Sequence, residues 1–141
     1  MRGHEITDHV NTLYIGGGTP SVLPLYVYER VLKALKEAGH GGPFDEFTME
    51  VNPEDIVEKG HEYVEGLLRL GVNRVSMGVQ SFDDGILRFM NRRHDADTAR
   101  KAYAVLAEAG VKNISIDLIF GLPQLSEEQW RNTLKNALVK T

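Results

Sequence analysis

The stretch Arg74-Val75-Ser76-Met77-Gly78-Val79-Gln80 decides the fold of this chain. Its apolar residues occupy every second position after the first, and the residues between them are small or polar. Because successive side chains of a strand point to opposite faces, this pattern predicts a strand with one apolar and one polar face. An amphipathic run precedes it and ends at Gly71, which is typical of a helix that leads into a strand.

The same pairing of a short strand with an amphipathic helix occurs four times along the chain. The predicted strands cover residues 12–15, 46–51, 74–80 and 113–120. The predicted helices cover residues 25–38, 62–70, 84–90, 96–109 and 127–139, with Gly39, Gly71 and Gly110 as C-cap residues and Ser126 as an N-cap three residues before Gln129. This alternation favours right-handed crossovers, so we expect an α/β fold in which four βα units form one parallel sheet.

The polar positions of the predicted strands form a second pattern. They are Tyr14, Gly16, Thr48, Glu50, Ser76, Gly78, Gln80, Ser115 and Asp117. Parallel strands buried on both faces are continuously apolar, and a filled barrel carries Val, Ile and Leu inside. The polar faces therefore predict a shared concave side that holds a ligand. An antiparallel sheet with one solvated face also explains the alternation, although the intervening helices argue against it.

The composition restricts partners and location. The chain has 141 residues, a net charge of -4 and dispersed basic residues, which gives no electrostatic case for nucleic acid or an anionic membrane. No apolar run approaches the roughly 18–20 residues that span a bilayer, and the N-terminus lacks the apolar stretch of a secretory signal. We therefore expect a cytoplasmic protein without a transmembrane segment. The absence of cysteine excludes thiolate metal sites, and the five scattered histidines are expected on the surface.

Candidate binding residues lie where the predicted strands end, because functional groups of parallel α/β folds gather there. The first strand leads into Gly16-Gly17-Gly18-Thr19-Pro20. Three glycines let a ligand approach the backbone closely, although a tight turn that needs positive φ has the same composition. The segment matches neither the spacing of a dinucleotide fingerprint nor that of a phosphate-binding P-loop.

The later strand ends carry polar side chains. Glu50 in a lumen needs a donor, which either a ligand or Arg74 could supply. The amide of Gln80 suits a diol because it both donates and accepts. Asp117 is flanked by apolar residues, so its ionisation requires a partner. Arg92 follows the short helix and either clamps a ligand carboxylate or is a solvated residue at a helix end.

Four motifs together resemble a known family. They are residues 13–20 (LYIGGGTP), 47–53 (FTMEVNP), 78–82 (GVQSF) and 116–123 (IDLIFGLP). In order and spacing they resemble the oxygen-independent coproporphyrinogen III oxidase-like family of radical S-adenosylmethionine (SAM) proteins. Residues 78–84 together with residues 92–94 are more similar to its haem-chaperone branch. The resemblance extends over residues 12–138.

The resemblance implies a (β/α)6 partial TIM barrel whose lumen holds SAM and a [4Fe–4S] cluster. By the resemblance, the backbone of Gly17 and Gly18, with Thr19, meets the methionyl amino group. Glu50, Gln80 and Asp117 then hold the amino group and the ribose hydroxyls, Arg92 meets the methionyl carboxylate, and Ile119 and Gly121 line the adenine side. It assigns no catalytic residue and no metal ligand to this chain.

The chain departs from the family pattern in two places. It lacks the three-cysteine motif CxxxCxxC, so we expect residues 1–141 to be an internal fragment of the radical SAM domain, with the cluster loop before Met1. The family usually has Gly-Gln-Thr after residues 121–123, where this chain has Gln124-Leu125-Ser126. An open sheet leaves two edges unpaired, so we also expect the fragment to self-associate.

The resemblance implies a parent protein of haem metabolism that binds SAM and a porphyrin or haem, while the fragment alone is inactive. Two alternatives remain open at this point. One is a haem-binding carrier without enzymatic turnover. The other is a sugar enzyme on a TIM barrel that uses the glycine-rich loop to bind phosphate.

The missing cysteines lead to a direct prediction. Iron–sulfur clusters are held by cysteine thiolates, so this chain should show no [4Fe–4S] charge-transfer absorbance after anaerobic reconstitution with iron and sulfide. A cluster band in the visible spectrum that persists after desalting would contradict the prediction.

Overall fold

The computed structural model describes residues 11–17, 20–118 and 127–140. In chain order the elements are β1 (Thr12–Ile15), the short 3-10 helix η2 (Pro20–Val22), α1 (Leu25–Glu37), β2 (Glu46–Val51), α2 (Pro53–Leu70), β3 (Arg74–Gln80), α3 (Asp84–Phe89), α4 (Ala96–Ala109), β4 (Ile114–Leu118) and α5 (Glu127–Lys140). The predicted alternation of strands and helices is confirmed.

The four strands form one sheet in the order β1-β2-β3-β4, and every neighbouring pair is parallel. The antiparallel alternative is therefore excluded for these strands. The register places Glu50 beside Ser76, and Ser76 beside Ser115, so polar residues of neighbouring strands lie on the same face. The pairing of β3 with β4 becomes irregular between Met77 and Gln80.

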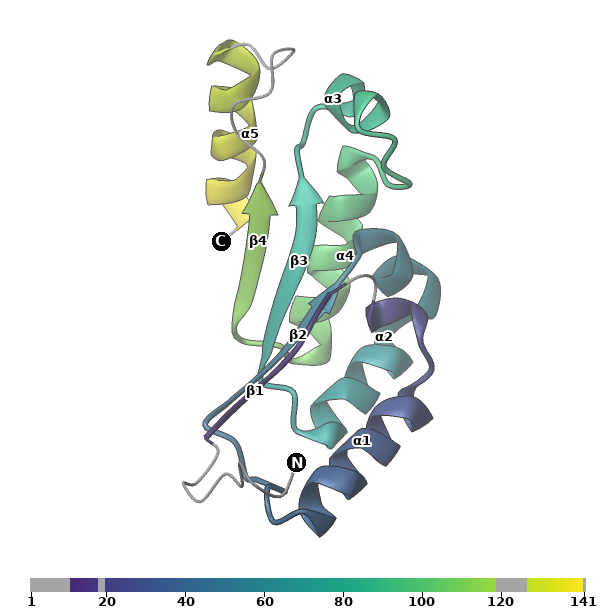
Figure 1. Ribbon diagram of the computed structural model, residues 1–141. Coiled ribbons are helices and arrows are strands. Elements are labelled where there is room, and N and C mark those ends of the chain that lie inside the picture. The colour runs from purple at the N-terminus through teal and green to yellow at the C-terminus, as the bar shows by residue number, and fades with distance from the viewer. Residues whose placement is uncertain (1–10, 18–19, 119–126, 141) are drawn as a thin grey trace.

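Helices α1, α2 and α4 cover one face of the sheet, and α5 runs alongside β4 (Figure 1). The apolar face of the strands packs against this helical layer. The buried core includes Phe47, Met49, Val51, Val75, Met77 and Val79 from the strands and Val64, Leu67, Ala102 and Leu106 from α2 and α4. The sequence pattern thus identified the apolar strand face correctly.

Helix α2 differs from the prediction, because it begins at Pro53 and not at residue 62. The predicted helix omitted Pro53 and the residues up to 61, whereas proline is well tolerated at the first helical position, where its missing N–H needs no partner. Glu54 and Asp55 follow in the first turn, where carboxylates are favoured by the helix dipole. A kink at Gly60, with φ +70°, divides the helix into the part that was predicted and the part that was not.

Helix ends otherwise follow the glycine signals. Gly71 and Gly110 are C-caps with φ +107°, a conformation that is strained for other residues. The first helix ends one residue earlier than expected, with Ala38 as its C-cap and Gly39 next in the left-handed region. Strand β4 is described for Ile114–Leu118, and the expected Ser126 cap lies outside the described residues.

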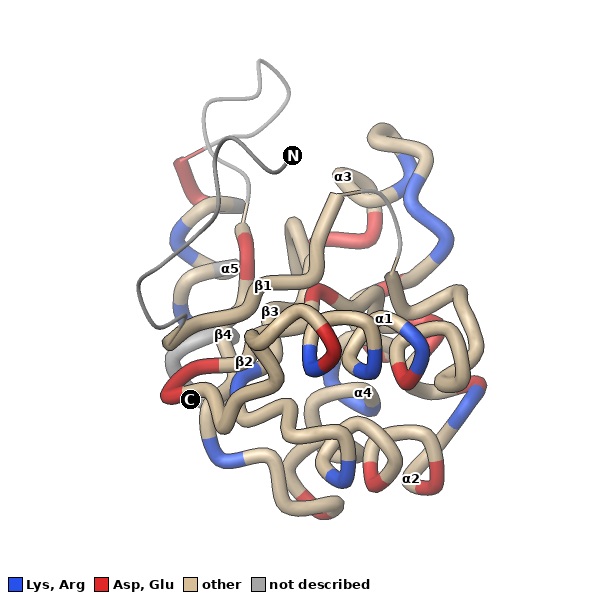
Figure 2. Tube along the Cα trace, turned by 60° about the horizontal axis from the view of Figure 1, so that its bottom comes forward, with Lys and Arg blue, Asp and Glu red and all other residues tan. Residues whose placement is uncertain are grey.

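Acidic and basic residues are interspersed along α1 and α2 (Figure 2), so these helices present no track of a single charge. Among the helices that the structure describes, none is both long and apolar enough to cross a membrane. Self-association through a strand edge stays a prediction.

The contact between α2, α4 and the sheet predicts where shortening a side chain lowers the free energy of unfolding most. Leu106 is completely buried in this core, so Leu106→Ala should lower the free energy of unfolding by about 3 kcal/mol. Leu134 on α5 is 38% exposed, and Leu134→Ala should cost less than about 1 kcal/mol. Denaturant titration of both variants measures the difference, and equal losses would contradict this assignment of the core.

Candidate SAM-binding site at the strand ends

A polar hollow of about 140 Å³ lies at the carboxyl ends of β2, β3 and β4. Its lining residues are Pro20, Glu50, Val51, Asn52, Ser76, Gly78, Gln80, Arg92 and Asp117. The structure therefore brings together the four polar side chains that the sequence singled out, Glu50, Gln80, Arg92 and Asp117. Tyr14 lies on the same strand face and is exposed, but it does not line this hollow.

The glycine turn after β1 is joined to Glu50. The backbone N–H of Gly17 donates a hydrogen bond of 2.9 Å to Oε1 of Glu50. A Cβ atom on Gly16 would lie 1.7 Å from the same oxygen, so only glycine leaves room for the carboxylate. Gly17 has φ +79°, which confirms that the turn also needs a left-handed residue. The turn explanation of the glycines is thus confirmed for Gly17, and close approach of a ligand stays a prediction.

Arg74 is not the partner of Glu50. Its guanidinium lies 3.6 Å from Glu46 and donates a hydrogen bond of 2.7 Å to the hydroxyl of Ser115. The alternative in which Glu50 merely forms a structural ion pair with Arg74 is therefore wrong.

Asp117 has a different environment from the one expected. Its neighbours in sequence are apolar, but its own side chain is exposed and accepts a hydrogen bond of 3.3 Å from the Ser76 hydroxyl. Solvent therefore stabilises its charge, and no buried cation is needed. The sequence pattern identified the face correctly but not the degree of burial.

The side chains of Gln80 and Arg92 both approach Gly78. A Cβ atom on Gly78 would be 3.5 Å from the Gln80 amide nitrogen and 3.6 Å from a guanidinium nitrogen of Arg92. Arg92 also donates a hydrogen bond of 3.1 Å to the carbonyl of Gly78. It is therefore anchored at the rim of the hollow and is not a freely solvated residue at a helix end.

Gln80 has an unusual backbone conformation for a residue with a side chain. Its φ is +71°, and Ser81 N–H donates to the Val79 carbonyl at 2.8 Å. These two features are those of a γ-turn with positive φ, a rare and strained conformation. Such strain costs on the order of 1–3 kcal/mol and is concentrated at functional sites.

The comparisons with known proteins agree with this geometry. Residues 2–137 match the family model of the radical SAM superfamily. The chain belongs to the radical SAM superfamily. It is 37% identical to the heme chaperone HemW of Lactococcus lactis over 93% of its length, and 35% identical to the oxygen-independent coproporphyrinogen III oxidase of Escherichia coli over 90%. It spans 34% and 27% of these relatives, respectively.

Solved structures show the same relationship. The coproporphyrinogen III oxidase HemN of Escherichia coli matches 94% of this chain with a TM-score of 0.82 and 34% identity, and the match covers 30% of that chain. The archaeal Elp3 of Methanocaldococcus infernus matches 89% of this chain with a TM-score of 0.72 and 28% identity. The predicted resemblance and the partial-barrel fold class are thereby confirmed.

Radical SAM family membership implies SAM and a [4Fe–4S] cluster, and the two groups fit this chain differently. The hollow offers carboxylates, an amide and a guanidinium, which suits a ligand with ammonium, carboxylate and hydroxyl groups. Gly17 does not line it and is joined to it through Glu50. The cluster does not fit, because the chain has no cysteine and its described residues contain no group of three or more His, Asp or Glu that could hold a metal.

Four of the nine residues assigned by resemblance lie outside the described residues. They are Gly18, Thr19, Ile119 and Gly121. Their roles in this radical SAM chain stay predictions.

The sequence analysis missed a buried charge network behind the hollow. His94 was expected on the surface, but it is only 4% exposed and faces Glu54. Arg93 lies 2.9 Å from Glu54 and 3.3 Å from Asp55, and Asp55 accepts a hydrogen bond of 2.8 Å from Ser21. No sequence pattern signalled this network, because its members are joined only by the packing of η2, α2 and the segment between α3 and α4.

Glu54 is ionised in this network. Burial would raise its pKa, but the contact with His94, its own backbone N–H and the charge of Arg93 lower the pKa to about 2. The folded pKa lies below the ordinary value of 4.5, so this group stabilises the fold fully above about pH 4.5. The contribution is lost as the pH falls toward 2.

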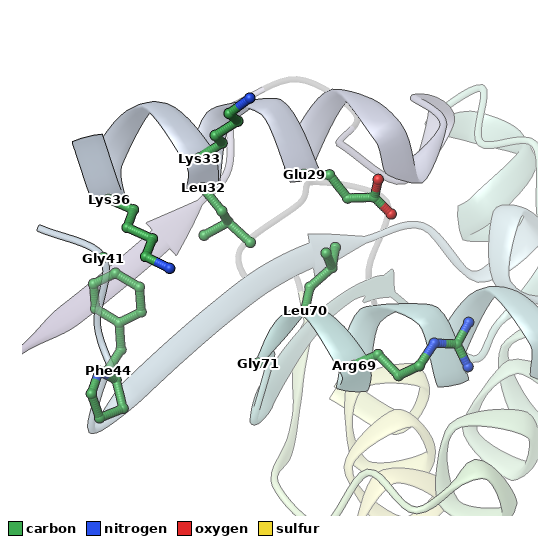
Figure 3. Close-up of a pocket in the computed structure, with 10 residues that line it drawn as sticks. Glu29, Leu32, Lys33, Lys36, Gly41, Phe44, Arg69, Leu70 and Gly71 are labelled. Atoms are coloured by element: carbon green, nitrogen blue, oxygen red, sulfur yellow. The ribbon is translucent and has the colours of Figure 1, made fainter. Parts of the chain in front are cut away.

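A second cavity, of about 570 Å³, lies between α1 and the end of α2 (Figure 3). Leu32 and Leu70 point into it from the two helices, and Lys36 extends toward the loop that carries Phe44. It contains none of the strand-end residues and lies on the helical side of the sheet. It is therefore separate from the hollow.

The contact between the glycine turn and Glu50 can be tested directly. In Gly16→Ala the new Cβ would displace the carboxylate, so the Gly17 amide should lose its hydrogen bond and exchange with solvent roughly tenfold faster. In the control Gly78→Ala the new Cβ makes only ordinary contacts, and Gly17 exchange should not change. Hydrogen exchange followed by NMR measures both, and unchanged exchange in Gly16→Ala would contradict the arrangement.

Proposed function

We propose that residues 1–141 are the central part of a radical SAM domain and that the hollow binds SAM. The observation that carries the proposal is the convergence of Glu50, Gln80, Arg92 and Asp117 on one cavity at the ends of parallel strands. In parallel α/β folds this edge of the sheet is where ligands bind. The membership of the chain in the radical SAM superfamily supports the choice of ligand.

The chemistry of SAM accounts for each group. Its amino group is a cation with N–H donors, which the carboxylates of Glu50 and Asp117 accept, and its ribose is a diol, which suits the Gln80 amide. Its carboxylate suits the guanidinium of Arg92, because such pairs form strong charge-assisted hydrogen bonds. Glu50 is already oriented by Gly17, so little ordering is required when the ligand binds.

The remaining assignments follow the family resemblance. Gly17, Gly18 and Thr19 would meet the amino group, and Ile119 and Gly121 would line the adenine. When bound, the cluster would supply the electron for reductive cleavage of SAM, and its cysteine ligands would come from outside residues 1–141. In this arrangement, residues 1–141 orient SAM by binding the amino acid and ribose groups of the ligand.

For the whole protein we propose a cytoplasmic role in haem metabolism, with a porphyrin or haem as the partner. The similarity to both heme chaperones and coproporphyrinogen III oxidases supports this role. The carrier without turnover is the second candidate, because a heme chaperone is among the relatives at 37% identity. Haem titration and an assay of porphyrinogen decarboxylation, both on the protein with its cysteine motif, would distinguish the two.

The proposed SAM site predicts which residues of this chain respond when the ligand is added. Titration of the isotopically labelled chain with SAM up to millimolar concentration should shift the amide resonances of Gly17, Ser76 and Gln80. Glu50→Gln should weaken binding about tenfold or more, because it removes a charged acceptor. The control Glu108→Gln removes an exposed surface carboxylate that pairs with His61, and it should leave binding unchanged. Absence of shifts at these amides, or equal effects of the two variants, would contradict the proposal.

A further inference from the structure

His94 lies in the segment between α3 and α4 and is the buried titratable group closest in sequence to Arg92. Its side chain has no solvent exposure. One ring nitrogen, Nε2, lies 2.8 Å from the carbonyl oxygen of Val79. A carbonyl oxygen only accepts hydrogen bonds, so Nε2 carries a proton.

The other ring nitrogen faces a carboxylate. Nδ1 of His94 lies 3.3 Å from Oε2 of Glu54. Both atoms are buried, and neither has a hydrogen-bond partner among the described residues. The ring is thus enclosed between the Glu54 carboxylate and the Val79 carbonyl, and its one hydrogen bond is the one to Val79.

The carbonyl of Val79 that His94 holds is the one that closes the turn at Gln80. It accepts from the Ser81 N–H as well as from His94, both at 2.8 Å. Among the described residues, Gln80 and Asn91 are the two other than glycine that have positive φ. A buried N–H donor on this carbonyl therefore stabilises a turn whose backbone is otherwise strained.

We propose that His94 is a positioning residue for the hollow: buried between the Val79 carbonyl and Glu54, it fixes the turn that directs Gln80 toward the ligand. His94 does not line the hollow, so it acts through the backbone and not by touching the ligand. The role for ligand binding rests on the proposed function, whereas the effect of His94 on the turn does not.

The same network connects the other walls of the hollow. Glu54 pairs with Arg93, Arg93 with Asp55, and Asp55 accepts from Ser21. The Ser21 hydroxyl accepts the N–H of Asn52 at 3.0 Å, and Asn52 itself lines the hollow. One run of charged and polar contacts thus joins the end of β3 to the end of β2 and to η2.

The hydrogen bond from His94 to the turn can be measured without a ligand. In NMR spectra of the chain with ¹⁵N-labelled histidine, Nε2 of His94 should carry a proton that exchanges slowly with solvent, because the ring is buried. A bare Nε2, or an Nε2 proton that exchanges as fast as that of the exposed His61, would overturn the proposal.

Variants test the positioning role. His94→Ala should shift the Gln80 amide resonance and weaken SAM binding about tenfold, because the N–H donor to Val79 is lost. His94→Gln retains an N–H donor for the carbonyl and should restore binding to within roughly threefold of the parent. The control His61→Ala removes a histidine that pairs with Glu108 at the surface, and it should change neither measurement.

The outcomes separate the two proposals. If SAM does not bind the parent chain but Nε2 of His94 carries a slowly exchanging proton and His94→Gln preserves the Gln80 resonance, the SAM site is wrong and the positioning of the turn stands. If SAM binds and a folded His94→Ala keeps full affinity, the positioning role is wrong. If His94→Ala does not fold, the comparison of His94→Gln with the parent decides, and a tenfold loss of affinity in His94→Gln would overturn the positioning role.

Discussion

The apolar side chains of β2 and β3 pack against α2 and α4, and this contact determines which way the side chains of these strands point. Phe47, Met49, Val75, Met77 and Val79 are buried in it. Because side chains alternate along a strand, burying these residues turns the intervening ones to the opposite face. Parallel pairing then brings those residues together at one edge of the sheet. The hollow is therefore a consequence of the core.

The polar face is stabilised by contacts that differ from strand to strand. Glu50 is oriented by a backbone N–H from the glycine turn, whereas Asp117 is exposed and accepts a hydrogen bond from a serine hydroxyl. Gln80 is held in a strained turn whose carbonyl also receives a donor from His94. An orienting contact of this kind reduces the conformational entropy that a polar side chain loses when a ligand binds. The rigid part of the hollow is thus the side nearest β2 and β3.

The structure also accounts for the difference between this chain and its longer relatives. It spans 34% of the heme chaperone and 27% of the oxidase that it resembles, yet it carries the polar groups of the hollow. Cluster ligation is a separate requirement, because it needs thiolates that this chain lacks. Orientation of SAM and ligation of iron therefore belong to different segments of the proposed domain.

The sequence by itself determined the α/β class, the strand faces and the presence of Glu50, Gln80 and Asp117 on one side, because the alternation of apolar and polar residues is a local property of each strand. It failed at the start of α2, where Pro53 is compatible with both a stop and a first helical turn. Only the tertiary structure decided that Arg74 pairs with Glu46 and not with Glu50, and that His94 is buried against Glu54. These contacts join residues 20 or more positions apart, and their energies depend on burial and distance, which no local pattern records.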